Sequence, residues 1–135
     1  MSKIDTLCIQ AGYEPKNGEP RVVPIVQSTT YAYDTAAGLA DLFDLKADGY
    51  FYTRLANPTV SALENKLTAL DGGVGAIACA SGMSATLLAI LNVCNAGDNI
   101  VSARAIYGGT YNLFSITLKK YGIECRFFDP DAPAD

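Results

Sequence analysis

The sequence predicts an α/β fold, in which an N-terminal arm is followed by the first strands of a mostly parallel sheet flanked by helices. From about residue 59 onward, helical and strand patterns alternate, whereas residues 1–58 are irregular and contain four of the six prolines. A polar tail, 130–135, follows the third expected strand, so the sheet is unfinished. We therefore expect an arm over residues 1–58 and the first part of a larger, truncated domain over residues 59–135.

The arm contains one expected helix and one expected strand. Asp34 and Thr35 can cap a helix with an apolar face of Leu39, Leu42 and Phe43, ending at Asp48-Gly49. The aromatic run 50–54 is typical of extended structure. In a strand, Tyr52 and Arg54 point to the same side, so a hydroxyl and a guanidinium can converge on one anion. The alternative is a surface arginine beside an aromatic hairpin.

A longer helix is expected to begin at Asn57-Pro58-Thr59. Asparagine is a good N-cap residue, and proline suits the first helical position because its missing N–H is not needed there. Apolar residues then recur at helical spacing, and Asp71-Gly72-Gly73 ends the helix. Strands are expected over 76–80, 99–103 and 124–128, with helices over 84–93 and from 108 to Gly122. This alternation implies a parallel sheet covered on both faces.

Composition excludes several classes of function. With 14 acidic and 10 basic residues the net charge is −4, and the absence of a basic run argues against general nucleic-acid binding. The longest apolar stretch, 86–94, is far shorter than a membrane span, and the N-terminus lacks the apolar core of a secretion signal. Without histidine, the chain has no Ser–His or Cys–His pair and no His-based metal site. Four widely spaced cysteines without a CxxC pair predict no metal site and a cytoplasmic location.

Two turns are candidate binding sites. In Ala80-Ser81-Gly82-Met83-Ser84-Ala85 an expected strand ends and a helix begins, and the first amides of such a helix form a site for an anion such as phosphate. Tyr107 follows the strand 99–103 at the edge where parallel sheets bind ligands, and its ring could stack on a flat cofactor. The alternatives are an ordinary strand-to-helix turn and a half-buried loop aromatic.

Three segments in this order resemble the Cys/Met-metabolism family of pyridoxal-phosphate-dependent enzymes. They are Tyr52–Thr59 (Tyr-Thr-Arg-Leu-Ala-Asn-Pro-Thr), Ala80–Ala85 and Tyr107–Thr110 (Tyr-Gly-Gly-Thr). The similarity also includes Pro24–Tyr31 and Leu70–Gly73, so it runs over nearly the whole chain. The first segment is specific, and its ordered combination with the other two distinguishes the likeness from chance.

The resemblance implies a fold type I enzyme with pyridoxal 5'-phosphate as its cofactor. Gly82 and Met83 would donate backbone amides to the cofactor phosphate. Tyr52 and Arg54 would reach the same phosphate in the active site of the neighbouring subunit. Tyr107 would stack on the pyridine ring and act catalytically by helping to protonate the departing γ-substituent. The implied partners are a small amino-acid substrate and further copies in a dimer or tetramer with shared active sites, with no nucleic acid and no membrane.

One catalytic group of the family has no counterpart in the sequence. The Schiff-base lysine lies in a Ser-x-Thr-Lys context, and none of the lysines at positions 3, 16, 46, 66, 119 and 120 has it. We therefore expect the 135 residues alone to be inactive and to be an N-terminal part of a longer transferase or lyase.

The sequence after Tyr107 resembles that of O-acetylhomoserine sulfhydrylases of the family more than that of methionine γ-lyases, which usually have a cysteine where this chain has Gly109. The implied reaction is γ-replacement on O-acetylhomoserine by sulfide or a thiol, giving homocysteine or methionine. Three alternatives remain open: methionine γ-lyase or cystathionine synthase or lyase activity, a non-catalytic fragment that associates with a complementary chain, and a generic nucleotide-binding module.

Overall fold

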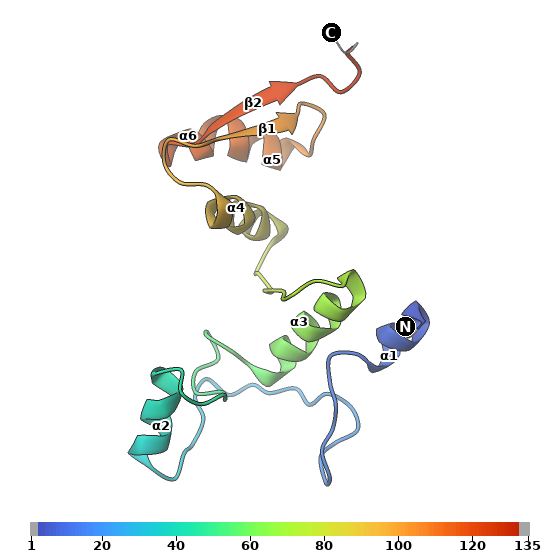
Figure 1. Cartoon of the computed structure of the whole chain (residues 1–135), viewed down its shortest axis with the longest axis vertical. Coiled ribbons are helices and arrows are strands. Elements are labelled where there is room, and N and C mark those ends of the chain that lie inside the picture. The colour runs from blue at the N-terminus through green and yellow to red at the C-terminus, as the bar shows by residue number, and fades with distance from the viewer. Residues whose placement is uncertain (1–2, 133–135) are drawn as a thin grey trace. The chain divides into compact units, whose positions relative to one another are not determined.

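The computed structural model describes residues 3–132, and its contacts form two compact units, Met1–Ala78 and Cys79–Asp135 (Figure 1). Unit 1 contains helices α1 (Ile4–Gln10), α2 (Ala36–Phe43) and α3 (Pro58–Asp71). Unit 2 contains α4 (Gly82–Val93), strands β1 (Asn99–Ala103) and β2 (Glu124–Phe128), and between them α5 (Gly108–Asn112), η1 (Leu113–Thr117) and α6 (Leu118–Lys120). The predicted α/β class is confirmed. The division into an arm over 1–58 and a cofactor domain from residue 59 stays a prediction.

Helix α3 begins and ends as its sequence predicts. The Asn57 side chain accepts a hydrogen bond from the Thr59 N–H at 2.9 Å, and Pro58 occupies the first helical position. Gly72 ends the helix in the left-handed conformation, with φ of +66°, which glycine adopts without a steric penalty. These terminal residues fix the start of α3 directly after the turn that contains Tyr52 and Arg54.

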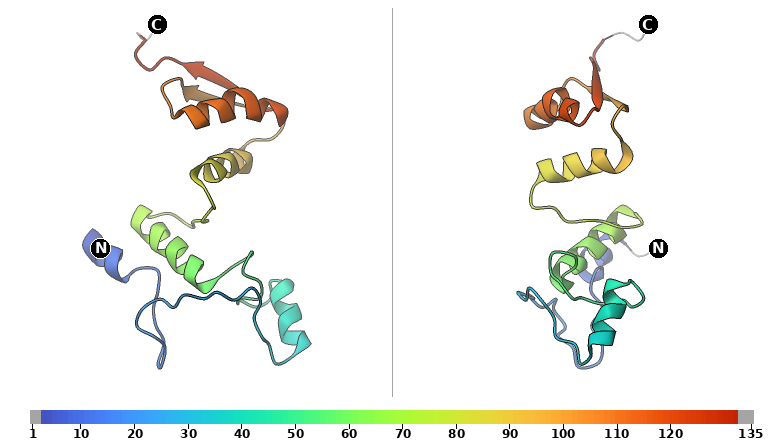
Figure 2. Two further views of the ribbon diagram at one scale, coloured as in Figure 1. Left: turned by 180° about the vertical axis from the view of Figure 1, so that it is seen from behind. Right: turned by 90° about the vertical axis from the view of Figure 1, so that its left-hand side faces the viewer.

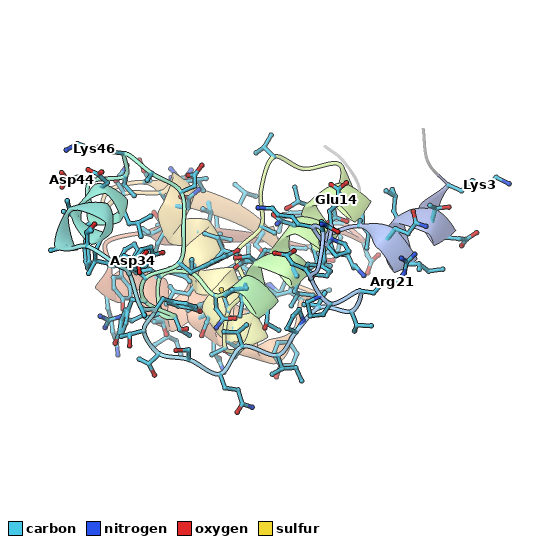
Figure 3. All side chains as sticks on the ribbon, turned by 90° about the horizontal axis from the view of Figure 1, so that it is seen from below. Lys3, Glu14, Arg21, Asp34, Asp44 and Lys46 are labelled. Atoms are coloured by element: carbon cyan, nitrogen blue, oxygen red, sulfur yellow. The ribbon has the colours of Figure 1, made fainter. Side chains whose placement is uncertain are left out.

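The other helices of unit 1 differ in part from expectation. Thr35 caps α2 as predicted, by accepting from the Gly38 N–H, but the helix ends at Phe43 rather than Asp48. Asp44 leaves the helical conformation and Leu45 has a φ of +56°, so the chain turns there. The exposed side chains of Asp44 and Lys46 pair at 2.7 Å just beyond α2 (Figure 3). Helix α1 was not predicted.

Two segments far apart in the sequence are joined side to side in unit 1. Residues 24–31 run along residues 52–59, with an antiparallel bridge between Thr30 and Tyr52. The Thr53 N–H donates to Thr29 O at 2.9 Å. At the other end, the Thr59 hydroxyl donates to Pro24 O at 2.7 Å and accepts from the Val26 N–H at 2.9 Å. We call these two segments the paired segments.

The predicted strand over 50–54 is wrong apart from Tyr52. The Tyr52 carbonyl accepts hydrogen bonds from the N–H groups of Leu55 and Ala56, so the chain turns directly after the single bridge. In a continuing strand, the Tyr52 carbonyl would accept from a neighbouring strand instead. The aromatic composition of the run does contribute to packing, because Phe51 contacts Phe43 with ring centroids 4.3 Å apart.

The predicted strand over 76–80 is also wrong in the part of the chain that the structure describes. These residues adopt no strand pairing, and the Ala78 N–H donates to the Glu64 carboxylate of α3 at 2.8 Å. An apolar run forms a strand only when a neighbour offers its backbone groups, and here a side chain takes that role. The described sheet consequently has two strands instead of the three expected.

The sheet of unit 2 is parallel, as predicted. β1 pairs with β2 in a register that places Ile100 opposite Cys125 and Ser102 opposite Phe127. The two views of Figure 2 show the α5–η1–α6 run lying along one face of this sheet. The opposite face, which carries Val101 and Arg126, is exposed in unit 2, so the expected cover on both faces is present on one.

A single apolar cluster lies between the helix run and the sheet. It consists of Leu113, Phe114, Leu118, Ile123 and Cys125, with side chains of α4 packed against it. The wider turn of η1 brings residues five apart onto one face, which places Leu113 and Leu118 together in the cluster. Burial raises the pKa of the Cys125 thiol, which keeps this residue a neutral, small hydrophobic group. Within residues 3–132, no helix combines the length and the apolar character needed to cross a membrane.

Candidate phosphate and cofactor site

The beginning of α4 presents unused hydrogen-bond donors. The Ser81 hydroxyl caps the helix by accepting from the Ser84 N–H at 3.1 Å, and the two hydroxyls lie 2.9 Å apart. Among the described residues, no acceptor takes the N–H groups of Gly82 and Met83, because the first turn of a helix has none to offer. Two amides and two hydroxyls at the positive end of a helix dipole form a site suited to a phosphate.

Tyr107 lies beside this site in the same unit. It precedes α5, and its side chain is 75% exposed. A methyl group on Gly109 would lie 2.6 Å from Tyr107 Cε1 and 3.2 Å from Met83 Sδ. Gly109 therefore brings the Tyr107 ring and the Met83 side chain together, and both stand at the N-terminal ends of their helices. The structure thus groups three of the predicted site residues, namely Gly82, Met83 and Tyr107.

Tyr52 and Arg54 form a second group, in unit 1. The Arg54 Cζ lies 5.0 Å from the centroid of the Tyr52 ring, within the range of a cation–π contact. The predicted strand geometry is not what brings them together, since the turn after Tyr52 folds the guanidinium back over the ring. The guanidinium remains exposed, and its planar donors are available to a carboxylate or phosphate. Their approach to a phosphate in a neighbouring subunit stays a prediction.

The sequence did not predict the hydrogen bonds that several polar side chains make around the second group. Asn57 was expected only as a helix cap, yet its amide also donates to the Thr53 hydroxyl and to Val26 O. Thr53 in turn donates to Ser28 O. The available signal was the pattern itself, because Ser, Thr and Asn at 28, 53, 57 and 59 are the residues that bond to backbone groups of irregular segments.

The chain belongs to the family described as Cys/Met metabolism PLP-dependent enzyme, which it matches over residues 5–135. It is 46% identical to a homocysteine/cysteine synthase of Kluyveromyces lactis, over 99% of this chain and 31% of that protein. It is 49% identical to O-acetyl-L-homoserine sulfhydrylase 1 of Thermus thermophilus, over 93% of this chain and 30% of that protein. The chain thus spans about three-tenths of the length of these relatives.

Solved structures agree with this assignment. The chain matches the crystal structure of an O-acetylhomoserine (thiol)-lyase from Campylobacter jejuni with a TM-score of 0.89 and 39% identity, over 98% of this chain and 32% of that one. That structure contains N'-pyridoxyl-lysine-5'-monophosphate. A cystathionine γ-lyase from Lactobacillus plantarum matches with a TM-score of 0.80 and 29% identity, over 95% of this chain and 31% of that one. The predicted family and the fold type are confirmed.

The residues present fit the phosphate end of this cofactor. A phosphate dianion needs several donors and no nearby carboxylate, and the α4 terminus offers amides and hydroxyls alone. The exposed Tyr107 ring adds a flat surface next to these donors. The α4 donors and the Tyr107 ring therefore lie in one unit, and Arg54 lies in the other.

Proposed function

We propose that these residues are the N-terminal part of a pyridoxal-phosphate-dependent enzyme that replaces the acetoxy group of O-acetylhomoserine with sulfide or a thiol. With sulfide, the carbon–oxygen bond to acetate breaks, a carbon–sulfur bond forms, and the products are homocysteine and acetate. The observation that carries the proposal is the free Gly82 and Met83 amides beside Tyr107, in a chain of this family. The names of the relatives, sulfhydrylase and homocysteine synthase, support the substrate class.

The binding roles follow from the donors on each element. The Gly82 and Met83 N–H groups and the hydroxyls of Ser81 and Ser84 hold the phosphate at the positive end of α4. Arg54 of a neighbouring copy would add a charged fork, and Tyr52 orients that fork through the contact of its ring with the guanidinium. When bound, the cofactor supplies an electron-accepting ring that makes protons of the substrate acidic.

Tyr107 has two roles in this proposal. Its ring would stack on the flat ring of the cofactor and so help to orient it. Its hydroxyl donates a proton toward the departing acetate oxygen, so that the leaving group does not depart as a bare anion in a closed site. The high exposure of this side chain in unit 2 leaves both the ring face and the hydroxyl accessible for these contacts.

The proposal extends to assembly and location. Apolar side chains exposed on the first 30 residues, including Ile4, Ile9, Val22 and Ile25, support contact of this segment with another copy in a dimer or homotetramer. Active sites shared between subunits would then allow Arg54 to serve a neighbour's phosphate. The composition of the cysteines, four without a CxxC pair, supports a cytoplasmic location.

The test uses the whole protein, by which we mean the longer enzyme of which these residues are proposed to be the N-terminal part. Purified with pyridoxal phosphate, it should show the absorbance band of the bound cofactor and form homocysteine from O-acetylhomoserine and sulfide. The isolated 135 residues should show neither, because none of their lysines lies in the Ser-x-Thr-Lys context. Cofactor binding by the whole protein with turnover of methionine or cystathionine instead would overturn the substrate assignment. Absence of the band would overturn the proposal entirely.

A further inference from the structure

Among the residues of unit 1 that the structure describes, Asn57 is the one buried polar residue, with 4% of its surface exposed. A buried amide costs free energy unless its donors and acceptor are all paired. Its Oδ1 accepts from the Thr59 N–H, which is the helix cap. Its Nδ2 faces three oxygens: Val26 O at 3.0 Å, Thr53 Oγ1 at 3.1 Å and Tyr31 Oη at 3.4 Å. The two halves of the amide thus serve different parts of unit 1.

The cap alone does not explain an asparagine at this position. Aspartate and serine cap helices about as well, because only an acceptor oxygen is required. The Nδ2 group is the feature that these residues lack. It reaches across the paired segments, with contacts to Val26 and Tyr31 on the 24–31 side and one to Thr53. The donor half of Asn57 therefore links the two segments through the interior.

Thr53 is the residue through which this link reaches the binding group. It lies between Tyr52 and Arg54, and its N–H donates to Thr29 O while its hydroxyl donates to Ser28 O. With that hydrogen committed to Ser28, the Thr53 oxygen is an acceptor for Asn57. Held at its backbone and its side chain, Thr53 sets the direction in which the residues on either side project.

We propose that Asn57 is a positioning residue for the phosphate-binding pair, acting through Thr53 to hold Arg54 over the Tyr52 ring. The inference rests on the proposed function in one respect, namely that phosphate is the target of Arg54. Without the Nδ2 donor, the turn after Tyr52 keeps its backbone bonds but loses its interior anchor. The guanidinium then samples a wider range of positions, and the phosphate loses a preorganised contact.

The experiment measures two dissociation constants on the apo form of the whole protein, one for pyridoxal phosphate and one for pyridoxal, which lacks the phosphate. The Asn57→Ser variant keeps a capping oxygen and removes the Nδ2 donor. This variant should lower the affinity for pyridoxal phosphate about tenfold and change the affinity for pyridoxal by no more than about twofold. Such a loss is comparable to that of one charge-assisted contact. A loss shared equally by both ligands would overturn the proposal.

Thr35→Ala is the control for a general loss of stability in unit 1. Thr35 caps α2 in the same unit through the same kind of bond, and none of its hydrogen bonds within the described residues goes to the paired segments. It should lower the thermal midpoint by an amount similar to that of Asn57→Ser and leave the ratio of the two constants unchanged. If Thr35→Ala shifts the ratio as much as Asn57→Ser does, the effect reports stability alone and the positioning role is wrong.

A second pair of variants tests the link from its other end, should Asn57→Ser fold poorly. Thr53→Ala removes the acceptor for Asn57 and should reproduce the loss of phosphate discrimination. Thr53→Ser keeps the hydroxyl and should restore it. Equal affinities for pyridoxal phosphate in the Thr53→Ala and Thr53→Ser variants would contradict the link.

Arg54→Ala separates this inference from the proposed function. If it weakens pyridoxal phosphate but not pyridoxal, phosphate is the target of Arg54, and the Asn57 and Thr53 variants then decide the positioning role by themselves. If it leaves the ratio of constants unchanged, the assumed role of Arg54 is wrong and the inference is overturned with it. The double variant Asn57→Ser, Arg54→Ala should weaken binding no further than Arg54→Ala, since the two residues act on one contact.

Discussion

Each of the two units of the chain is stabilised internally by a different kind of interaction. Unit 2 has one continuous apolar cluster between a helix run and a two-stranded sheet. Unit 1 buries Leu42 and Ala62 separately and joins its long irregular segments through hydrogen bonds of Asn57, Thr53 and Thr59. Apolar packing is non-directional, whereas hydrogen bonds specify orientation. The part of the molecule that presents an arginine on a turn is thus the part built from directional contacts.

Truncation of the apolar cluster should have the largest effect and would test this contrast most directly. Leu118 is fully buried, at 0% exposure, and contributes to the cluster from α6. Leu118→Ala should lower the free energy of unfolding by about 2–5 kcal/mol, measured by urea denaturation of the whole protein.

The control for this variant lies two residues away. Ile116, in η1, is 57% exposed in unit 2, and Ile116→Ala should cost less than about 1.5 kcal/mol. If both substitutions cost the same, the cluster is not the main source of stability in unit 2, and the proposed difference between the units fails.

A close backbone contact in unit 1 should give the next largest effect. Gly12 has a φ of +91°, and a methyl group there would lie 2.2 Å from the Ala62 carbonyl oxygen of α3. Because the neighbour is backbone, Gly12→Ala should displace the chain that follows α1 and cost about 2–3 kcal/mol of unfolding free energy. Gly18 provides the control, since its φ of +83° is similar but nothing lies within 4 Å of its added methyl group. Gly18→Ala should cost about 1 kcal/mol, and equal losses would show that conformational strain alone is responsible.

The sequence predicted the helices and strands whose signals are local. Asn57-Pro58 and Gly72 fixed the ends of α3, and short apolar runs identified β1 and β2. Two other predicted strands, over 50–54 and 76–80, lack the partner strand they required, and at 76–80 Glu64 takes the Ala78 N–H. A strand is defined by its neighbour, and apolar composition does not reveal which group will accept each N–H.

In the candidate site, as in the fold, the features with local signals were predictable and the long-range contacts were not. The free amides at Gly82 and Met83 follow from the start of a helix after Ser81, and the Ser-Gly signal for that start is visible in the sequence. The interior links from Asn57 to Thr53 and Val26 were not visible, because they join residues up to 31 positions apart. Side-chain hydrogen bonds across irregular segments have no periodicity, so only the structure shows which Thr or Asn makes them.

The smallest stability effect, with the clearest functional consequence, is expected at Gly109 in unit 2. Here the atoms nearest to an added methyl group are Tyr107 Cε1, at 2.6 Å, and Met83 Sδ, at 3.2 Å, both on side chains. An exposed ring can swing away at little cost, unlike the backbone carbonyl that faces Gly12, and alanine also favours the helix. Gly109→Ala should therefore change the unfolding free energy by less than about 0.5 kcal/mol.

Displacement of the Tyr107 ring should instead change the affinity for the cofactor. If Tyr107 stacks on the pyridine ring, Gly109→Ala should weaken pyridoxal and pyridoxal phosphate alike, by about three- to tenfold, because the stacked surface and not the phosphate contact is lost. Gly108→Ala is the matched control, since a methyl group there meets nothing within 4 Å and should leave both affinities unchanged. Loss of phosphate discrimination in Gly109→Ala would place the disturbance at the α4 amides. An equal effect at Gly108 would show that the start of α5, and not the ring of Tyr107, contacts the cofactor.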